Sequence, residues 1–404
     1  MMPAADACTD RVVYVSYDGL LEALGSSQVL PYVRGLAQKG FAMTVISFEK
    51  PEDLRREDRV TRLGDSLGEL GIQWHRLRYH RTPTFPATAF DVARAAVRIR
   101  RLRPALIHAR SYVAALMGDL GIGRNRSPLV FDMRGLWIDE RIAGQGWDPG
   151  GAKVRQGRRL ETRLLSNADH VVHLTNTARR QIEVDFPGLS SERHSTIPTC
   201  ADLSRFKVPG DVGEVRNDLG LPANGPILVH AGTLGARCQV QRTFEVGKAF
   251  VRRTGGIFLV LSRQRAECEA AARAVGVAAT VRSVDHEDMP RWLASADAGI
   301  ALVQLGPATV AAAPTKVGEY LATGLAVAAT PAGDLESHFA DAECSFVISD
   351  NEVPDRTAQR LADTLCSPLR QAESRGLADR YYSLDTAVEA YSAIYRRLGV
   401  RACA

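Results

Sequence analysis

The stretch Ala313–Thr330, APTKVGEYLATGLAVAAT, joins a short helical pattern to an apolar run. Pro314 suits the first helical position, where its missing N–H removes no hydrogen bond, and Gly324 suits the end of the helix. The run Leu325–Thr330 follows at once and is typical of a strand that is covered on both faces. We therefore expect a helix packed between buried strands, as in a parallel α/β sheet.

The same alternation of apolar runs and helical patterns extends through the whole chain. The expected strands are 11–17, 42–48, 106–110, 128–134, 170–175, 226–233, 256–263, 278–284, 298–304 and 325–330. Amphipathic segments such as 27–38 and 90–102 lie between strands, and 384–399 is predicted to be a final amphipathic helix. Strands this short cannot be told from buried helices by periodicity, so the alternation carries the prediction. It indicates an α/β fold with two doubly wound, Rossmann-like parallel-sheet domains.

The length of 404 residues also indicates two domains, because a single domain has roughly 100–200 residues. The polar stretch 193–213 contains prolines and glycines and is the expected join. We predict an N-terminal domain over 1–200, a C-terminal domain over 201–380 and a terminal segment over 381–404.

Composition excludes several classes of protein. The net charge of +5 is mild and mixed with acids, which argues against nucleic acid as a partner. The 7 cysteines form no CxxC pair and the 9 histidines show no metal-ligand spacing, so we place no metal. The start lacks a signal-peptide pattern, and no run reaches the ~18 apolar residues of a membrane helix. We expect a soluble cytoplasmic protein that could still touch a membrane surface.

The helix that starts near Thr315 is the first candidate site. Ligands of open parallel sheets bind at the carboxyl ends of strands, and a helix start attracts phosphate through its unpaired N–H groups. Thr315 and Lys316 add a hydroxyl and a charge, and Glu319, one turn on, could accept two ribose hydroxyls. The alternative is an ordinary surface pair of Lys316 and Glu319, which contributes only ~0.2–0.5 kcal/mol.

Another loop of the second half could approach the same ligand. In HAGTLGA (230–236), Gly232 and Gly235 allow close backbone contact, although the pattern is not the GxGxxG of nicotinamide-binding proteins. Arg237 and Arg263 are cations near the same sheet edge and could meet a pyrophosphate. The alternatives are a plain turn and two solvated arginines.

Polar residues also follow strands of the first half. Gly25, Ser26 and Ser27 are expected at a helix start, where they could bind a ligand or simply cap the helix. Asp132 and Arg134 stand at a strand end, and Asp132 is a candidate general base or sugar-hydroxyl contact.

Three charged residues follow Trp137, which is expected to be buried: Asp139, Glu140 and Arg141. The alternative to a functional site for this stretch is a structural ion-pair network. Arg94, Arg98 and Arg101 share one helical face, which could meet anionic lipid head groups or be solvated.

Several of these stretches resemble one family. PTKVGEYLATGLAVAAT (314–330) is similar to the donor-nucleotide motif of retaining GT-B glycosyltransferases of the family 4 type, in a PTK-GEYLA subgroup. Further stretches follow in the family's order and spacing; they are 16–40, 131–140, 197–206, 230–235 and 289–303. Together they cover nearly the whole chain.

The resemblance implies two Rossmann-like domains that face a central cleft, with a nucleotide-sugar donor held mainly by the C-terminal one. It implies that the last helix returns to the N-terminal domain. Glu319 would bind the ribose, and the diphosphate would be held by a set of loop residues. These are Thr315, Lys316, Gly232 and Thr233, with Gly25 and Ser26 approaching from the other domain. Asp132 stands where the family often has a histidine that touches the transferred sugar.

The chain also departs from the family pattern. Ala311 stands eight residues before Glu319, where a first glutamate is usual, and this position commonly contacts the sugar. Thr233 and Gln239 stand where the family usually has an arginine and a lysine. Lys316, together with Arg237 or Arg263, could supply the missing charge.

The resemblance implies a retaining hexosyltransferase that needs no metal and no cofactor besides its nucleotide diphosphate sugar. The acceptor would be a hydroxyl of a glycan or lipid-linked glycan in bacterial polysaccharide or glycoconjugate biosynthesis. The protein is expected in the cytoplasm, where it could also bind peripherally to the inner face of the membrane. Two alternatives stay open. One is a nucleotide-sugar 2-epimerase that uses Asp132 with His108, and the other is a binding protein without catalysis, suggested by Ala311.

Overall fold

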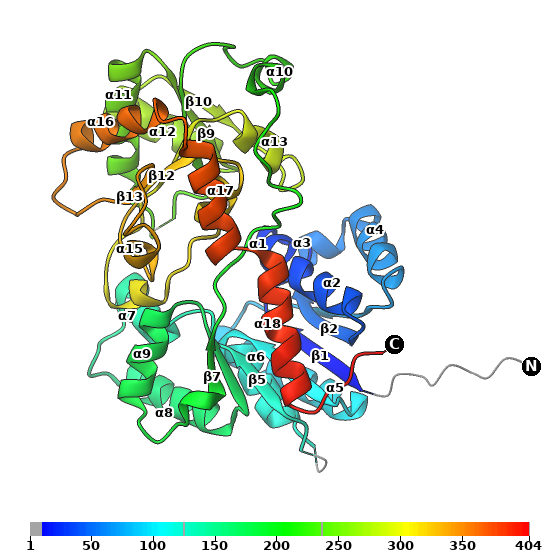
Figure 1. Ribbon diagram of the computed structural model, residues 1–404. Helices are drawn as coiled ribbons and strands as arrows, with labels where there is room; N and C mark the ends of the chain where they lie inside the picture. The colour runs from blue at the N-terminus through cyan, green and yellow to red at the C-terminus, as the bar shows by residue number, and fades with distance from the viewer. Residues whose placement is uncertain (1–9, 124–125, 236, 404) are drawn as a thin grey trace, which may run out of the picture. The chain divides into compact units, whose positions relative to one another are not determined.

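The computed structural model describes residues 10–123, 126–235 and 237–403. The chain divides into two compact units (Figure 1). Unit 1 comprises Met1–Ile197 together with Asp385–Ala404, and unit 2 comprises Pro198–Leu384. Each unit has its own parallel sheet with helices between the strands.

Unit 1 is built on seven parallel strands in the order β3-β2-β1-β4-β5-β6-β7. Their bounds are β1 Arg11–Ser16, β2 Ala42–Glu49, β3 Gln73–Arg78, β4 Leu106–Arg110, β5 Leu129–Asp132, β6 His170–His173 and β7 His194–Thr196. The central strand β1 pairs with β2 through Val12 and Met43 and with β4 through Val12 and Leu106. The central strands are almost fully buried, as expected of a sheet covered on both faces.

The helices of unit 1 fill the connections between these strands. They are α1 Ala23–Gln28, α2 Leu30–Gln38, α3 Pro51–Leu54, α4 Glu57–Gly68, α5 Thr84–Leu102, α6 Ser111–Gly121, α7 Trp137–Gln145, α8 Ala152–Asn167, α9 Asn176–Asp185, the 3-10 helix η1 Ser191–Arg193 and α18 Leu384–Arg397. The expected final helix is therefore present as α18, drawn in red in Figure 1. It packs closely on α2, because a Cβ added at Gly35 would lie 2.6 Å from Val388.

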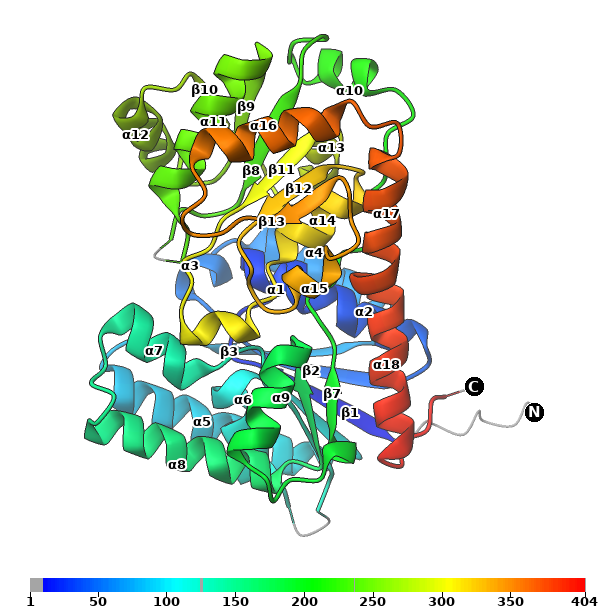
Figure 2. The ribbon, with the colours of Figure 1, turned by 60° about the vertical axis from the view of Figure 1, so that its left-hand side comes forward.

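Unit 2 has six parallel strands in the order β10-β9-β8-β11-β12-β13. Their bounds are β8 Ile227–Ala231, β9 Ile257–Leu261, β10 Ala279–Arg282, β11 Ala298–Ala301, β12 Ala326–Ala329 and β13 Ser345–Val347. Figure 2 shows β8, β11, β12 and β13 side by side. Its helices are α10 Val212–Asp218, α11 Val240–Thr254, α12 Arg265–Val275, α13 Met289–Ala294, the 3-10 helix η2 Pro307–Ala311, α14 Thr315–Ala322, α15 Leu335–His338, α16 Pro354–Leu365 and α17 Arg370–Tyr381.

Two apolar clusters cover the two faces of the unit 2 sheet. Alternate residues of one strand enter different clusters: Val229 of β8 joins one and Leu228 the other. The first cluster includes Tyr320 of α14, and the second includes Phe250 of α11 and Leu361 of α16. Because successive side chains of a strand point to opposite faces, the sheet is sandwiched between helices on both sides.

The predicted fold class is confirmed, since both sheets are parallel and alternate with helices. Three strands were not predicted: β3, β7 and β13. The strand β3 is an edge strand with exposed arginines, and β7 and β13 have only three residues each, so none carries a long apolar run.

Several predicted helix limits were wrong. The segment 27–38 forms two helices, α1 and α2, and the segment 90–102 belongs to a longer helix that begins at Thr84. Pro314 does not occupy the first helical position. Its ψ of 115° is extended, which makes it the N-cap residue and places Thr315 first in the helix. Gly324 ends the region with a positive φ of 79°, as predicted for a helix stop.

None of the helices in the described part of the chain combines the length and apolar character needed to cross a membrane. This finding concerns helices that cross a membrane and does not bear on contact with a membrane surface.

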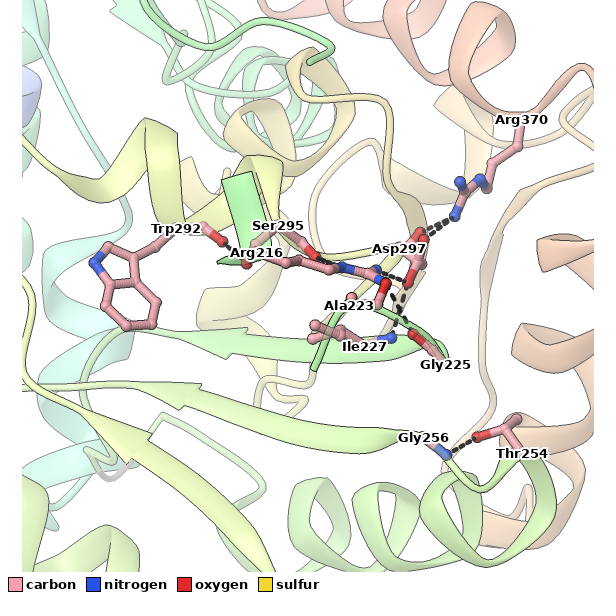
Figure 3. A network of polar contacts seen from close by, with 10 residues as sticks. All are labelled: Arg216, Ala223, Gly225, Ile227, Thr254, Gly256, Trp292, Ser295, Asp297 and Arg370. Carbon is pink, nitrogen blue, oxygen red and sulfur yellow. Dashed lines mark hydrogen bonds and ion pairs between the residues drawn. The ribbon is translucent and has the colours of Figure 1, made fainter. Parts of the chain in front are cut away.

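A buried arginine network holds together the amino-terminal side of the unit 2 sheet (Figure 3). The Arg216 side chain is 5% exposed and donates to the carbonyls of Ser295, Ala223 and Gly225. Its remaining nitrogen meets the Asp297 carboxylate at 2.6 Å, and that carboxylate also accepts the N–H of Ile227, the first residue of β8, at 2.8 Å. A fixed guanidinium therefore satisfies backbone groups that the sheet and its turns leave without partners.

We expect Arg216→Ala to lower the free energy of unfolding of unit 2 by about 3–5 kcal/mol, because Asp297 and three carbonyls would lose a buried partner. Urea unfolding followed by circular dichroism and tryptophan fluorescence measures the change. Arg291→Ala is the matched control, since Arg291 pairs with Asp218 at 2.7 Å on the exposed surface and should matter little. Equal losses in the two variants would contradict the role given to burial.

Candidate functional site

The carboxyl end of β8 turns sharply beside a lysine. Gly232 follows the last residue of β8, has a φ of 112° and donates its N–H to the carbonyl of Leu261 at the end of β9. A Cβ added at Gly232 would lie 3.3 Å from the Nζ atom of Lys316. The lysine ammonium therefore lies against the backbone of Gly232, and the φ angle favours glycine at this position.

The helix α14 is fixed to this strand end through Tyr320. The Tyr320 hydroxyl accepts the N–H of Ala231, the last residue of β8, at 2.7 Å. The Tyr320 ring lies directly over β11, where a Cβ on Gly299 would come within 2.3 Å of it. Because Tyr320 and Lys316 are four residues apart on α14, anchoring the tyrosine also sets the position of the lysine.

The charges at this site are strongly perturbed by burial. Burial raises the pKa of Glu319 to about 7, and the positive charges of Lys316 and Arg205 act in the opposite direction. Burial lowers the pKa of Lys316, against the raising effects of Cys238 and Glu319. Burial, and then the charge of Lys316, also lower the pKa of the fully buried His230. Lys316 and Arg205 are thus two cations beside a single carboxylate, that of Glu319, and burial disfavours the charge of this carboxylate. An added anion would therefore be stabilised here.

The structure brings only part of the predicted set together in unit 2. Gly232, Lys316 and Glu319 form one cluster, and Thr315 opens the helix that carries two of them. Thr233 and Arg237 are exposed on the loop after β8. Arg263 is exposed and forms an ion pair with Asp285 at 3.0 Å, which places its charge on another partner.

The position of the missing glutamate is an apolar one. Ala311 ends the 3-10 helix η2 and is 4% exposed. A glutamate at this position would therefore be largely shielded from solvent in this structure.

Sequence reasoning missed two residues beside the cluster. Arg205 donates to the carbonyl of His286 at 3.2 Å, and its charge acts on Glu319. Cys238 is close enough to Lys316 for the two to influence each other's pKa. The stretch 197–206, IPTCADLSRF, belongs to the resemblance and contains Arg205, so a signal for the arginine was present.

A second polar cluster lies at the carboxyl end of the unit 1 sheet. Asp132 is the last residue of β5 and is 2% exposed. Its Oδ2 atom accepts the Tyr391 hydroxyl at 3.2 Å and lies 3.6 Å from His108 Nε2 and 3.7 Å from an Arg134 nitrogen. The chain turns directly afterwards, because Arg134 has a φ of 57° and Gly135 a φ of 153°.

The state of Asp132 follows from these neighbours. Burial alone raises its pKa, but the charge of Arg134, the nearby His108 and the charge of Arg110 outweigh burial and lower it. Burial lowers the pKa of His108, whose Nδ1 atom meets the Tyr395 hydroxyl at 2.7 Å. An ionised carboxylate with a lowered pKa is a weak base, which favours the hydroxyl-accepting role of Asp132 over that of a general base.

Arg110 completes the cluster and was not singled out from the sequence. It meets the Asp18 carboxylate at 2.7 Å and donates to the Gln28 side chain at 2.8 Å, and Arg134 donates to the same oxygen at 3.5 Å. Tyr391 and Tyr395 were missed as well, because their helix is more than 250 residues away from Asp132 in the sequence.

Gly25 and Ser26 lie near the start of a helix, but that helix begins at Ala23, earlier than predicted. Both residues lie inside the short helix α1, and the Ser26 hydroxyl donates to the carbonyl of Ala23. Gly25 is buried against the preceding loop, since a Cβ there would lie 2.0 Å from the carbonyl oxygen of Gly19. The glycine is needed for this packing, whatever else it contacts.

Asp139, five residues after Arg134, belongs to a structural ion-pair network. Asp139 pairs with Arg158 at 2.6 Å, and Arg158 also pairs with the fully buried Glu161 at 2.8 Å. The ion-pair alternative considered for this stretch therefore describes Asp139. Trp137 is only partly buried and opens α7.

Comparison with known proteins agrees with this architecture. Residues 25–200 match the family model described as a glycosyl transferase 4-like domain. D-inositol 3-phosphate glycosyltransferase of Acidothermus cellulolyticus is 30% identical over 132 residues, which are 32% of this chain and 28% of that protein. The chain thus matches less than a third of the length of this curated relative.

Solved structures resemble the chain over nearly its whole length. Sucrose-phosphate synthase from Thermosynechococcus elongatus has a TM-score of 0.73 and 15% identity, covering 96% of this chain and 99% of that one. HepE of Anabaena, crystallised with UDP and glucose, has a TM-score of 0.70 and 14% identity over 96% and 100%. WaaG, a glycosyltransferase involved in lipopolysaccharide biosynthesis, has a TM-score of 0.67 and 16% identity over 94% and 99%.

The resemblance to GT-B glycosyltransferases of the family 4 type is therefore confirmed. Residues 25–200 match the model of a glycosyl transferase 4-like domain, and the chain has the GT-B fold. The narrower subgroup suggested by the PTK-GEYLA pattern stays a prediction.

We expect Tyr320→Phe to lower the free energy of unfolding by about 1–3 kcal/mol, because the buried N–H of Ala231 would lose its acceptor. Chemical unfolding measures this loss. Tyr381→Phe, the same change at a partly buried tyrosine of α17, is the control and should cost less. A Tyr320→Phe protein as stable as wild type would mean that the hydroxyl does not hold α14 on β8.

Proposed function

We propose that the chain is a glycosyltransferase that moves a hexose from a nucleotide diphosphate sugar to a hydroxyl of a glycan or glycolipid. The observation that carries the proposal is the cluster at the end of β8, where the Lys316 ammonium lies against Gly232 and Glu319 follows one turn later. Support also comes from the glycosyl transferase 4-like domain and from the neighbour HepE, which was crystallised with UDP and glucose.

The donor would bind along the start of α14. Lys316, the backbone of Gly232 and the hydroxyls of Thr233 and Thr315 suit the diphosphate, because this helix start combines N–H groups with a full positive charge. Glu319 suits the ribose, whose two neighbouring hydroxyls can both donate to one carboxylate. Binding of the diphosphate would also relieve the excess of positive charge that Lys316 and Arg205 create.

In the proposed reaction, the acceptor oxygen forms a bond to the anomeric carbon while the bond to the donor phosphate breaks. The diphosphate leaves with the electron pair, and one of its oxygens takes the acceptor proton. Lys316 stabilises the developing negative charge, so the step requires no metal ion in this proposal. The anomeric carbon becomes oxocarbenium-like, and retention of configuration is proposed from the family resemblance.

Asp132 is proposed to accept a hydrogen bond from a sugar hydroxyl, with Arg134 holding the carboxylate in its charged form. Its lowered pKa makes it less suited to abstracting a proton, which weakens the 2-epimerase alternative. Ala311 motivates the second alternative, a sugar-nucleotide-binding protein without catalysis. Incubation with donor alone separates these functions: an epimerase yields a second nucleotide sugar, and a binding protein leaves the donor intact.

Glu319 gives the first test of donor binding, by thermal shift with a panel of nucleotide diphosphate sugars at ~100 times the dissociation constant. One of them should stabilise the wild type by about 2.7 kcal/mol. Because the pKa of Glu319 is raised to about 7, the affinity should rise between about pH 6 and pH 8, as the carboxylate ionises and becomes an acceptor only.

The same panel on Glu319→Gln supplies the control. Glutamine occupies nearly the same volume without titrating, so its affinity should be lower and independent of pH in this range. If no nucleotide sugar stabilises either protein, donor binding at α14 is excluded. An equal pH dependence in both would assign the titration to another group.

Lys316→Ala should lower the turnover number by about 10²–10³-fold and change donor affinity less, because the lysine acts mainly on the charge of the leaving diphosphate. Donor hydrolysis and transfer to a mixture of glycan acceptors are suitable assays. Arg263→Ala is the matched control, since the charge of Arg263 is already paired with Asp285. An unchanged turnover number in Lys316→Ala would remove the lysine from the mechanism.

A further inference from the structure

The sequence around α5 carries an unusually one-sided charge. Between Gly71 and Arg103 the chain contains eight arginines and a single acid, Asp91. Asp91 is fully buried, where it meets His80 and the Tyr17 hydroxyl. The surface formed by β3 and α5 is therefore strongly positive although the whole chain carries a net charge of only +5.

The same surface exposes large apolar side chains. Phe85, Phe90 and Val97 of α5 are 74%, 54% and 46% exposed. Within the described residues, these two phenylalanines are the only aromatic members of the set of large, exposed apolar side chains. A shallow hollow of about 410 Å³ lies beside Phe90 and Val97, and its lining mixes apolar side chains with arginines: Leu77, Phe90, Ala93, Arg94, Val97, Arg98 and Arg101. Large exposed apolar side chains beside such a hollow mark a candidate surface for another molecule or a membrane.

Arginines lie beside Phe90 and Val97 in this hollow. Arg94 lies over the Phe90 ring, with its guanidinium carbon 5.4 Å from the ring centroid. Arg98 and Arg101 are exposed on the same helix, and Arg100 donates to the carbonyl of Leu120 at 2.8 Å. Guanidinium groups bind phosphate oxygens in pairs of hydrogen bonds, so this arrangement offers several contacts to a phosphate-bearing surface.

We propose that the surface formed by Phe85, Phe90, Val97, Arg94, Arg98 and Arg101 docks unit 1 on an anionic lipid membrane. The arginines complement the head-group phosphates, and the phenylalanines enter the boundary between head groups and acyl chains. Arginines alone would suit any polyanion, but phenylalanines that stand 54–74% exposed gain little from a hydrated nucleic acid backbone and much from a lipid boundary. The combination therefore favours lipid.

This proposal goes beyond the proposed function, because it concerns unit 1 and needs neither donor nor catalysis. A failure of nucleotide-sugar binding leaves it standing, and a failure of lipid binding leaves the site at α14 standing. If both proposals hold, an acceptor that is itself anchored in the membrane would be the simplest substrate.

The test is sedimentation of the full chain with vesicles. Vesicles of phosphatidylcholine with about 30% phosphatidylglycerol should pellet the wild type, and vesicles of phosphatidylcholine alone should not. Raising the salt from about 0.1 M to about 1 M shortens the Debye length from ~10 Å to ~3 Å and should release most of the protein.

Two pairs of variants make the test specific. Phe85→Gln with Phe90→Gln should reduce binding to anionic vesicles by more than about tenfold. Val184→Gln with Val353→Gln changes two apolar residues that are 74% and 61% exposed elsewhere, and should bind like wild type. Thermal unfolding should be close to wild type for both pairs, since all four side chains are exposed.

The charge is tested in the same way. Arg98→Glu with Arg101→Glu should also reduce binding by more than about tenfold, whereas Arg253→Glu with Arg356→Glu, on exposed positions of α11 and α16, should not. The proposal is overturned if wild type does not sediment with anionic vesicles at low salt, or if the α5 variants bind like their controls. It is also overturned if the phenylalanine pair keeps full vesicle binding while wild type binds a single-stranded RNA equally well, which would make α5 a general polyanion surface.

Discussion

The hydrogen bond from the N–H of Ala231 to the Tyr320 hydroxyl is the contact on which the candidate donor site depends. A parallel strand that ends inside a protein leaves backbone groups that need partners, and here a side chain from the next layer supplies one. The bond requires Gly299 on β11, because any side chain there would collide with the tyrosine ring. Once Tyr320 is fixed, α14 can place Lys316 only at the end of β8, against the backbone of Gly232.

The electrostatics of that corner follow from its burial. A carboxylate and an ammonium a single helical turn apart would normally stabilise each other in water and contribute little. In this corner, burial raises the pKa of Glu319 and lowers that of Lys316, so each is less firmly charged than on a surface. A bound diphosphate and ribose would supply what both groups lack: an anion for the lysine and hydroxyl donors for the carboxylate. Arg205 adds a second cation from a distant part of the same unit.

Unit 1 also contains a buried carboxylate, but the neighbours of this carboxylate shift its pKa in the opposite direction. Asp132 is as buried as Glu319, but it lies beside Arg134 and His108 and accepts a tyrosine hydroxyl, so its pKa is lowered and not raised. Two carboxylates at the carboxyl ends of two sheets are thus set to different states by their neighbours. The neighbours of Asp132 come from β4, the turn after β5 and the last helix of the chain. Unit 1 therefore needs α18 to complete its polar cluster, and all of this helix except Leu384 belongs to unit 1.

The sequence by itself determined the fold class, because apolar runs that alternate with helical patterns allow little besides parallel sheets covered on both faces. It also placed Lys316 and Glu319 one turn apart, Asp132 at a strand end and Gly232 after another, since these are local features of spacing. It could not show that Gly25 serves packing, that Arg263 is engaged by Asp285 or that Tyr391 reaches Asp132. Only the tertiary structure decided these points and the charge states of the two carboxylates, because each depends on burial and on partners that are distant in the sequence. Periodicity records which face a residue occupies, whereas a pKa or a hydrogen bond is set by whatever side chain the fold brings to that face.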